Sequence, residues 1–206
     1  MKLVLNSLSS NAFMNLFRTV LLCRLDSTRP IAFSVGVGSD VCNISDSVEE
    51  DMSEFISNVS SSYFTINSES DLAKLELSVN GTLELSQESS ALASCNVQVL
   101  NLGVDGVLHS LESVPVVVYF RRAAGHFTAD ENEEFLQSRG VDTSKLVVVN
   151  SRHCPIQKYT FEPVDSDNGK TTYEVSIETD GSITAESAAD LALSLIDGDS
   201  NSAVLS

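Results

Sequence analysis

Basic residues are scarce in this sequence. Only 12 lysines and arginines stand against 29 aspartates and glutamates in 206 residues, and the formal net charge is −17. A protein that binds nucleic acid by itself needs clustered Lys and Arg side chains to contact phosphates. We therefore expect little or no direct contact with nucleic acid. Two interpretations of the acidity remain: partners that are basic proteins, or a charge that keeps the chain soluble.

Cysteine clusters and catalytic motifs are missing as well. The cysteines are widely spaced with no C-x-x-C pair, so the sequence supports neither a metal site nor a disulfide framework. They are Cys23, Cys42, Cys95 and Cys154. The three histidines, at positions 109, 126 and 153, are far apart, and none has a nucleophile or carboxylate at a recognisable motif spacing. We therefore expect no catalytic residues, no metal and no cofactor.

Long apolar runs are also absent. Polar residues interrupt the N-terminal segment, so it lacks the continuous apolar core of a signal peptide. No stretch is long enough to span a membrane. We therefore expect a cytoplasmic protein. Because 42% of the residues are hydrophobic, the chain can build one ordinary domain or two small ones without disulfides.

Two segments near the chain ends have the spacing of amphipathic helices, with apolar residues at i, i+3, i+4, i+7 and i+8. In the first segment, residues 11–23, these residues are Phe13, Leu16, Phe17, Val20 and Leu21. In the second, which follows a candidate cap at Thr184, they are Ala188, Leu191, Ala192, Leu195 and Ile196. Each predicted helix has an apolar stripe that needs a partner, and the two stripes can cover each other.

Alternating apolar and polar residues predict a β-hairpin close to the second helix. Its strands are residues 159–164 and 173–178, and the turn between them is Asp167-Asn168-Gly169-Lys170. Residues 63–120 are β-rich as well, and we expect turns at Asn80-Gly81 and Asp105-Gly106 to separate their strands.

Three shorter strands and two more helices complete the prediction. The strands are residues 2–5, 31–37 and 145–149. Ser47-Val48-Glu49-Glu50 fits a capping box that opens a helix extending to Val59. Residues 128–136 look like a second capped, acidic helix. The predicted fold class is therefore α+β.

Four segments carry motifs that occur in one family in the same order. Asn15–Leu22 reads N-L-F-R-T-V-L-L, similar to N-A-L-R-R-I-L-L, and Val48–Phe55 reads V-E-E-D-M-S-E-F, similar to V-Q-E-D-I-L-E-I. Ile177–Ala188 is similar to I-E-T-N/D-G-T/S-I-x-P-E-E-A, and Phe120–Ala129 loosely to V-x-x-G-R-G-Y-V-P-A. Over roughly residues 1–197 the chain resembles the N-terminal domain of the DNA-directed RNA polymerase α subunit, in the family that also includes the archaeal D-like chains.

The resemblance implies a fold in two parts. Residues 1–29 and 153–197 would form a discontinuous dimerisation domain, with two terminal helices on a sheet. Residues 30–152 would form an inserted β-rich domain, and residues 198–206 a polar tail. The family dimerises through its first and last helices. The corresponding dimer interface here would consist of Phe13, Leu16, Phe17, Val20, Leu21, Leu191 and Leu195.

The resemblance also implies partners, because α dimers are the platform on which the β and β′ subunits assemble. Carried over by position, the residues expected to contact β are Asn15, Arg18, Glu49, Glu50 and Asp51. Those expected near β′ are Arg152, His153 and Pro155. The family's paired arginines are replaced here by Arg18-Thr19, so the contact with β is expected to be reduced or retuned.

The leading hypothesis is therefore a non-catalytic α-like subunit of a multisubunit DNA-directed RNA polymerase, a nucleotidyltransferase complex. It would dimerise with itself or with a paralogue. The alternative is a decoy that mimics α and inhibits a host polymerase, and a stand-alone hydrolase is a third, weakly supported class. The resemblance ends without the family's C-terminal DNA-binding domain, and it favours a divergent member of a viral or otherwise reduced polymerase. A viral protein would act in the host cytoplasm.

Overall fold

The chain folds as two units, each built from strands and helices. The computed structural model describes residues 2–5, 11–36, 48–49, 51–104, 106–164 and 172–202. One unit, here called the terminal unit, combines Met1–Asp26 with His153–Ser206. The other, the middle unit, comprises Ser27–Arg152. Neighbouring strands pair antiparallel in the two larger sheets of the described residues, and the fold is mixed α and β, as the sequence predicted.

The sheet of the terminal unit has three strands in the order β1-β11-β10. They are β1 (Lys2–Leu5), β10 (Ile156–Val164) and β11 (Thr172–Thr179). The alternation in β11 buries Val175 and Ile177, whereas Glu178, the next residue along the strand, is exposed. The predicted hairpin is confirmed, although the residues proposed for its turn lie outside the described residues.

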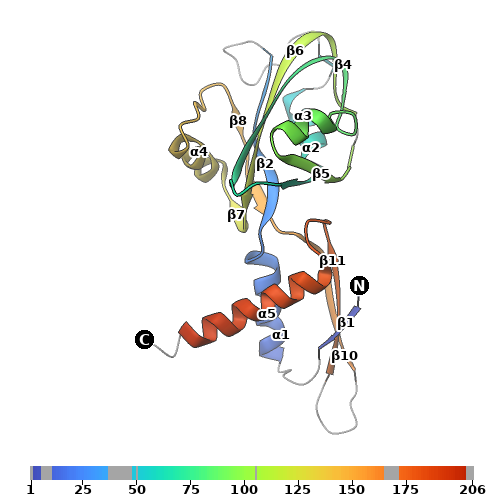
Figure 1. Cartoon of the computed structure of the whole chain (residues 1–206), viewed down its shortest axis with the longest axis vertical. Coiled ribbons are helices and arrows are strands. Elements are labelled where there is room, and N and C mark those ends of the chain that lie inside the picture. Colours follow the sequence, from blue (N-terminus) through green and yellow to red (C-terminus); the bar gives the residue numbers. More distant parts are fainter. Residues whose placement is uncertain are drawn as a thin grey trace. The chain divides into compact units, whose positions relative to one another are not determined.

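Two helices complete this unit and pack against each other (Figure 1). They are α1 (Asn11–Cys23), as predicted, and α5 (Ala185–Ser202). The hydroxyl of Thr184 accepts a hydrogen bond from the Ser187 backbone N–H at 3.2 Å, which confirms the predicted cap. Helix α5 continues past the apolar stripe into the polar residues up to Ser202. Its alanines are almost fully buried, so small side chains line the surface that α5 turns to the core.

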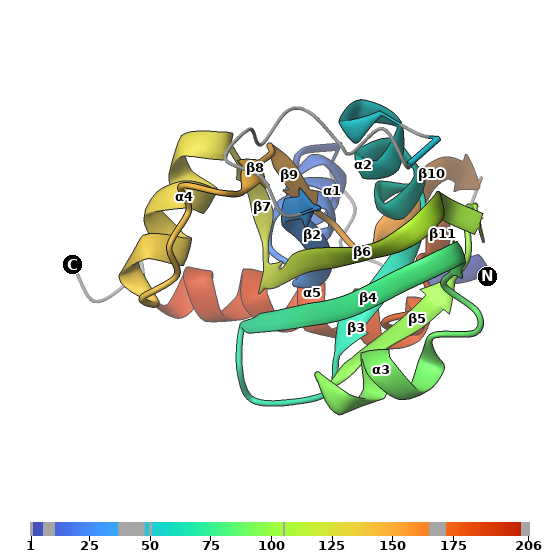
Figure 2. The same ribbon diagram turned by 90° about the horizontal axis from the view of Figure 1, so that it is seen from above.

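The middle unit is built on a larger sheet with the order β4-β6-β2-β3-β5 (Figure 2). These strands are β2 (Ser27–Val35), β3 (Tyr63–Ile66), β4 (Leu72–Glu84), β5 (Val97–Asn101) and β6 (Gly106–Ala123). A short strand, β8 (Val147–Val148), also pairs with β2. Strand β6 pairs with β4 on one side and with β2 on the other, and β2 is the middle strand of this order.

One predicted break in this sheet is wrong, and one strand begins earlier than predicted. The turn expected at Asn80-Gly81 is instead a register shift within the continuous strand β4, and Gly81 has a φ of +91° there. A glycine with positive φ can occupy either a turn or a β-bulge. Here the strand continues to pair with β6 beyond Gly81, so the glycine lies in a bulge. The strand predicted at residues 31–37 begins earlier than expected, because β2 starts at Ser27 and contains Pro30. Pro30 lies next to a register shift, where a residue without an N–H is tolerated.

Three helices and two short strands surround the sheet. They are α2 (Met52–Ser60), α3 (Ser89–Ser94), α4 (Ala129–Ser138), β7 (Gly125–Phe127) and the paired β9 (Ser151–His153). The predicted acidic helix is confirmed as α4, and Thr128 and Glu131 form its capping box. No helix in the part of the chain that is described is long and apolar enough to cross a membrane.

The capping box predicted for α2 is wrong. The helix begins later, and its N-cap is Asp51, whose carboxylate accepts a hydrogen bond from the Glu54 backbone N–H at 2.8 Å. Val48 instead forms an isolated β-bridge with Ser110, and Ser47 lies outside the described residues. An aspartate one turn further along competes as a cap, because carboxylates cap as well as hydroxyls do.

Candidate assembly surfaces

The apolar stripe of α1 faces two ways. Phe17, Val20 and Leu21 are buried in the core of the terminal unit, together with Met14 from outside the predicted stripe. Phe13 is half-buried, and Leu16 is 48% exposed. Of the α1 residues expected at a dimer interface, three therefore stabilise the chain's own core. Leu16, with an edge of Phe13, remains available to another molecule.

The apolar residues of α5 are likewise split between a buried set and an exposed set. Ala188, Ala192 and Ile196 are buried, whereas Leu191 and Leu195 are 48% and 36% exposed. Both exposed leucines belong to the set predicted for the dimer interface. The two packed helices therefore present three exposed leucines while their buried faces form one core.

A row of aromatic rings joins α1 to the hairpin. The ring centroids of successive pairs are 6.4 Å (Phe13–Phe17), 6.3 Å (Phe17–Tyr159), 5.9 Å (Tyr159–Phe161) and 5.8 Å (Phe161–Tyr173) apart. The hydroxyl of Tyr159 is buried without a hydrogen-bond partner among the described residues. Burial raises the pKa of Tyr159 to about 12, and the charge of Arg18 opposes this rise.

The solvent side of α1 carries the first residues expected to contact β. Asn15, Arg18, Thr19, Leu22 and Cys23 line a shallow hollow of about 370 Å³. The Thr19 hydroxyl donates a hydrogen bond to the Asn15 carbonyl oxygen at 2.9 Å, so it is satisfied within the helix. Arg18 is exposed on this surface. The structure thus brings Asn15 and Arg18 together one turn apart.

The second group expected to contact β is the acidic segment before α2. Glu49 is exposed, and Asp51 is exposed but bound as the N-cap of α2. Glu50 lies outside the described residues. This group and Arg18 belong to different units of the chain.

The residues expected near β′ are mostly inaccessible. His153 is fully buried and Pro155 is also buried, whereas Arg152 is exposed. A buried side chain cannot reach a partner unless the fold opens. Arg152 is therefore the one residue of the three whose side chain is available in the folded chain.

The middle unit contains a buried polar cluster that the sequence did not predict. Asn132 of α4 is fully buried and donates to the Val149 carbonyl oxygen at 2.8 Å and the Ser151 hydroxyl at 3.0 Å. It accepts a hydrogen bond from the Arg121 guanidinium at 3.0 Å. Arg121 also lies over the rings of Phe127 and Phe135, at 3.8 and 4.1 Å from their centroids. The cluster attaches α4 to the sheet.

The next arginine is also used structurally. Arg122 donates hydrogen bonds to three backbone carbonyls of the β3–β4 connection, those of Ile66, Ser68 and Glu69. The adjacent pair therefore serves opposite sides of β6, as alternation in a strand requires. Two adjacent arginines at the end of a predicted strand could have indicated a structural role for both side chains. No local pattern indicated that Asn132 is buried.

Metal ligands do not cluster in the described residues, where no group of three or more His, Cys, Asp or Glu side chains could hold an ion. Cys23 and Cys95 are free thiols, and Cys42 lies outside the described residues. Burial raises the pKa of the Cys95 thiol.

The sequence is similar to that of a known RNA polymerase subunit. No protein-family model matches the sequence. The chain is 28% identical over 188 residues to the DNA-directed RNA polymerase subunit alpha of Chlorobaculum tepidum. The match covers 88% of this chain and 55% of the relative, so the chain spans about half of that protein's length. Across most of its residues, the chain is thus similar to a part of an RNA polymerase α subunit.

Proposed function

We propose that the chain is a non-catalytic, α-like subunit of a multisubunit DNA-directed RNA polymerase. The observation that carries the proposal is the similarity to an α subunit over 188 residues, which covers 88% of this chain. In this role the chain dimerises, with itself or with a paralogue, and scaffolds the β and β′ subunits. The terminal unit serves as the dimerisation domain and the middle unit as the inserted domain.

The proposed dimer face is Leu16, Leu191 and Leu195, with Phe13 at its edge. Exposed leucines on two packed helices are costly in water, since burial of apolar surface is worth about 25 cal/mol per Å². In a two-fold dimer the same surface of both copies meets, so the leucines of one copy would be buried against the leucines of the other. Phe17, Val20 and Leu21 support this face from inside.

The proposed contacts with the large subunits are polar. Asn15 and Arg18 in the hollow on α1 and Glu49 before α2 face the β subunit, together with Asp51 and Glu50. Arg152 faces β′. Arg18 matters most in this set, because basic residues are few in this chain and an arginine can bind a carboxylate with two parallel hydrogen bonds.

Co-expression with β- and β′-like chains, followed by native mass spectrometry, tests the proposal. We expect a complex with two α-like chains per β and β′. Arg18→Glu is expected to abolish capture of β, and Lys158→Glu, an equal charge reversal on an exposed residue of the same unit, is expected to leave it intact. A stable monomer that captures neither large chain would overturn the proposal.

RNA synthesis separates this role from that of a decoy. A polymerase reconstituted with this chain as its α-like component is expected to transcribe. If the chain binds large subunits but the complex makes no RNA, and if it inhibits a polymerase that already has its own α subunit, it is an α mimic and the scaffold role fails.

A further inference from the structure

The two edges of the middle sheet are built differently. One edge is β4, where Lys74 and Glu76 form an exposed ion pair and Gly81 introduces a bulge. Charges and bulges on an edge strand discourage another strand from pairing with it. The β4 edge is therefore protected against strand addition.

The other edge, β5, carries no charge, although it has a bulge: Phe64 pairs with Val99 and Tyr63 with Asn101, so Leu100 is the extra residue. Its sequence, V-Q-V-L-N, contains neither a charge nor a proline. Within the described part of the chain, β5 pairs with β3 and with no other strand, with Phe64 opposite Val99 and Ile66 opposite Val97. The remaining backbone N–H and C=O groups of β5 point away from β3, as they do in any edge strand. This edge is open to an additional strand.

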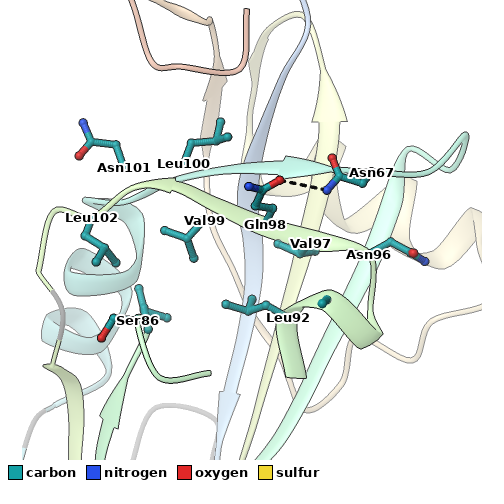
Figure 3. A pocket seen from close by; sticks show the side chains of 12 residues that line it. Asn67, Ser86, Leu92, Asn96, Val97, Gln98, Val99, Leu100, Asn101 and Leu102 are labelled. Atoms are coloured by element: carbon teal, nitrogen blue, oxygen red, sulfur yellow. Dashed lines mark hydrogen bonds between the residues drawn. The ribbon is translucent and has the colours of Figure 1, made fainter. Parts of the chain in front are cut away.

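A groove of about 810 Å³ runs along β5 (Figure 3). Every residue from Asn96 to Leu102 lines it, and residues 85–86 and 92–93 form its other side. Leu85, Leu92 and Val97 are buried at its base, whereas Gln98 and Asn101 are exposed at its rim. In Figure 3, Val99 and Leu102 point toward the side of Ser86 and Leu92, and Leu100 points the opposite way. The groove thus offers apolar contacts next to a free strand edge.

Hydrogen bonds fix both ends of this strand. At one end the Asn67 backbone N–H donates to the Asn96 carbonyl at 2.7 Å, and the Asn67 side-chain amide donates to Gln98 at 3.2 Å. At the other end the Gly103 N–H donates to the Ser62 hydroxyl at 3.0 Å. A Cβ at Gly103 would lie 2.2 Å from the Ser61 hydroxyl oxygen, so a glycine is required for this approach. The edge is held in place before any partner arrives.

Charge indicates what kind of segment the edge accepts. Residues 75–120 contain no lysine or arginine and five carboxylates. Two of these, Glu84 and Glu88, flank the lining residues 85–86, while none of the lining residues is itself charged. A partner with apolar residues opposite the groove and basic residues on either side complements this arrangement.

We propose that β5 binds an extended, Lys- or Arg-flanked apolar segment of another protein, which adds to the sheet as a further strand. Backbone hydrogen bonds supply affinity in such complexes, and alternate side chains enter the neighbouring groove. A small-molecule site would instead have a few polar groups that converge on the ligand, and here the amides are spread along the strand. The proposal does not depend on the polymerase role.

Peptide binding to the full chain tests the proposal. The probes are blocked heptapeptides Lys-Lys-X-Thr-X-Lys-Lys, with Val, Ile, Leu, Phe or Tyr at both X positions. We expect at least one to bind at or below about 1 mM and to shift the backbone amide resonances of residues 97–101. N-methylation of alternate peptide nitrogens removes the donors and is expected to weaken binding about 10-fold or more. Glutamate in place of the four lysines is expected to do the same.

A matched pair of variants separates the two edges. Gln98→Lys places a charge on the β5 edge and is expected to weaken peptide binding about 10-fold or more. Thr82→Lys places the same charge on the β4 edge and is expected to have little effect on peptide binding. Circular dichroism establishes that each variant is folded, and the N-methylated peptides test the backbone contact even if Gln98→Lys does not fold.

Four results would overturn the proposal. They are failure of the whole panel at about 1 mM, equal binding of the N-methylated peptides, resonance shifts confined to β4, and equal loss in both lysine variants. If light scattering shows an oligomer that Gln98→Lys dissociates, the occupant of the edge is a second copy of this chain, and the proposed partner is also wrong.

Discussion

The terminal and middle units both expose large apolar side chains, but in different places. In the middle unit, Phe33 packs against Phe55 and Phe64 packs against Phe120, and all four are buried. The exposed apolar residues of this unit lie outside its helices and are Leu102, Val104 and Leu111. The terminal unit instead exposes Leu16, Leu191 and Leu195 on two helices that pack against each other. A second copy of this helix pair could cover the three leucines together, and the following substitutions test this contrast.

The largest expected effect is in the core of the terminal unit. Phe17 is fully buried and contacts two other rings, so Phe17→Ala is expected to lower the free energy of unfolding by about 3–5 kcal/mol. Denaturant unfolding measures the change. Leu16→Ala, on the same helix, is expected to cost under about 1 kcal/mol in the monomer. Equal losses would mean that Leu16 also belongs to the core.

A smaller effect is expected at the exposed leucines. Leu191→Asp is expected to weaken self-association about 100-fold, roughly 2.7 kcal/mol, because it places a carboxylate in the proposed apolar interface. Analytical ultracentrifugation measures the dissociation constant. Leu111→Asp alters a leucine that is 78% exposed in the middle unit and serves as the control. If both variants, or neither, change association, the comparison between the units fails.

The middle unit is expected to depend on its buried amide. Asn132→Ala removes the acceptor of Arg121 and leaves the Val149 carbonyl without its donor, so we expect a loss of about 2 kcal/mol. Thermal unfolding measures this loss, and hydrogen exchange locates it in α4. The control is Glu134→Ala, an exposed position on the same helix. An unchanged exchange pattern in α4 would show that the cluster does not hold the helix.

The smallest effect at neutral pH is expected for Tyr159→Phe. The hydroxyl has no partner among the described residues, so its removal is expected to change the free energy of unfolding by under about 1 kcal/mol at pH 7. The pKa of Tyr159 is about 12 in the folded chain and near 10 when exposed, so the folded state holds the proton more tightly. Its contribution is present below pH 10 and is lost as pH rises toward 12.

Denaturant unfolding of both proteins from pH 7 to pH 12 measures this difference. The wild-type chain is expected to lose more stability than the variant above pH 10. Parallel curves for the two proteins would mean that the tyrosine is solvated. A large loss in the variant at pH 7 would mean that the hydroxyl has a partner.

The sequence predicted the positions of helices and strands better than it predicted which of their residues are buried. The bounds of α1 and the pairing of the hairpin followed from periodicity, because an amphipathic pattern records which faces are buried. Periodicity could not tell which members of a stripe face the core. Met14 is fully buried although it was not assigned to the stripe, and Leu16 is exposed although it was. That choice depends on the angle at which α5 crosses α1.

The predictions that failed depend on contacts between residues that are far apart in the sequence. The bulge at Gly81 depends on β6, and the burial of Asn132 depends on Val149 and Ser151. None of these partners can be identified from the segment that needs them. The same limit applies to His153 and Pro155, which were selected by position in a family and whose burial no local pattern revealed.

The discontinuity of the terminal unit has a consequence for the order of events during synthesis. Helix α1 is translated before the middle unit, but the strand and helix that contact it, β10 and α5, are translated after that unit. Domains generally fold as units while the ribosome is still extending the chain. The middle unit can therefore fold first, while the nascent helix still exposes Phe17 and Leu21. During that interval, these apolar side chains are exposed in a state that is prone to aggregation.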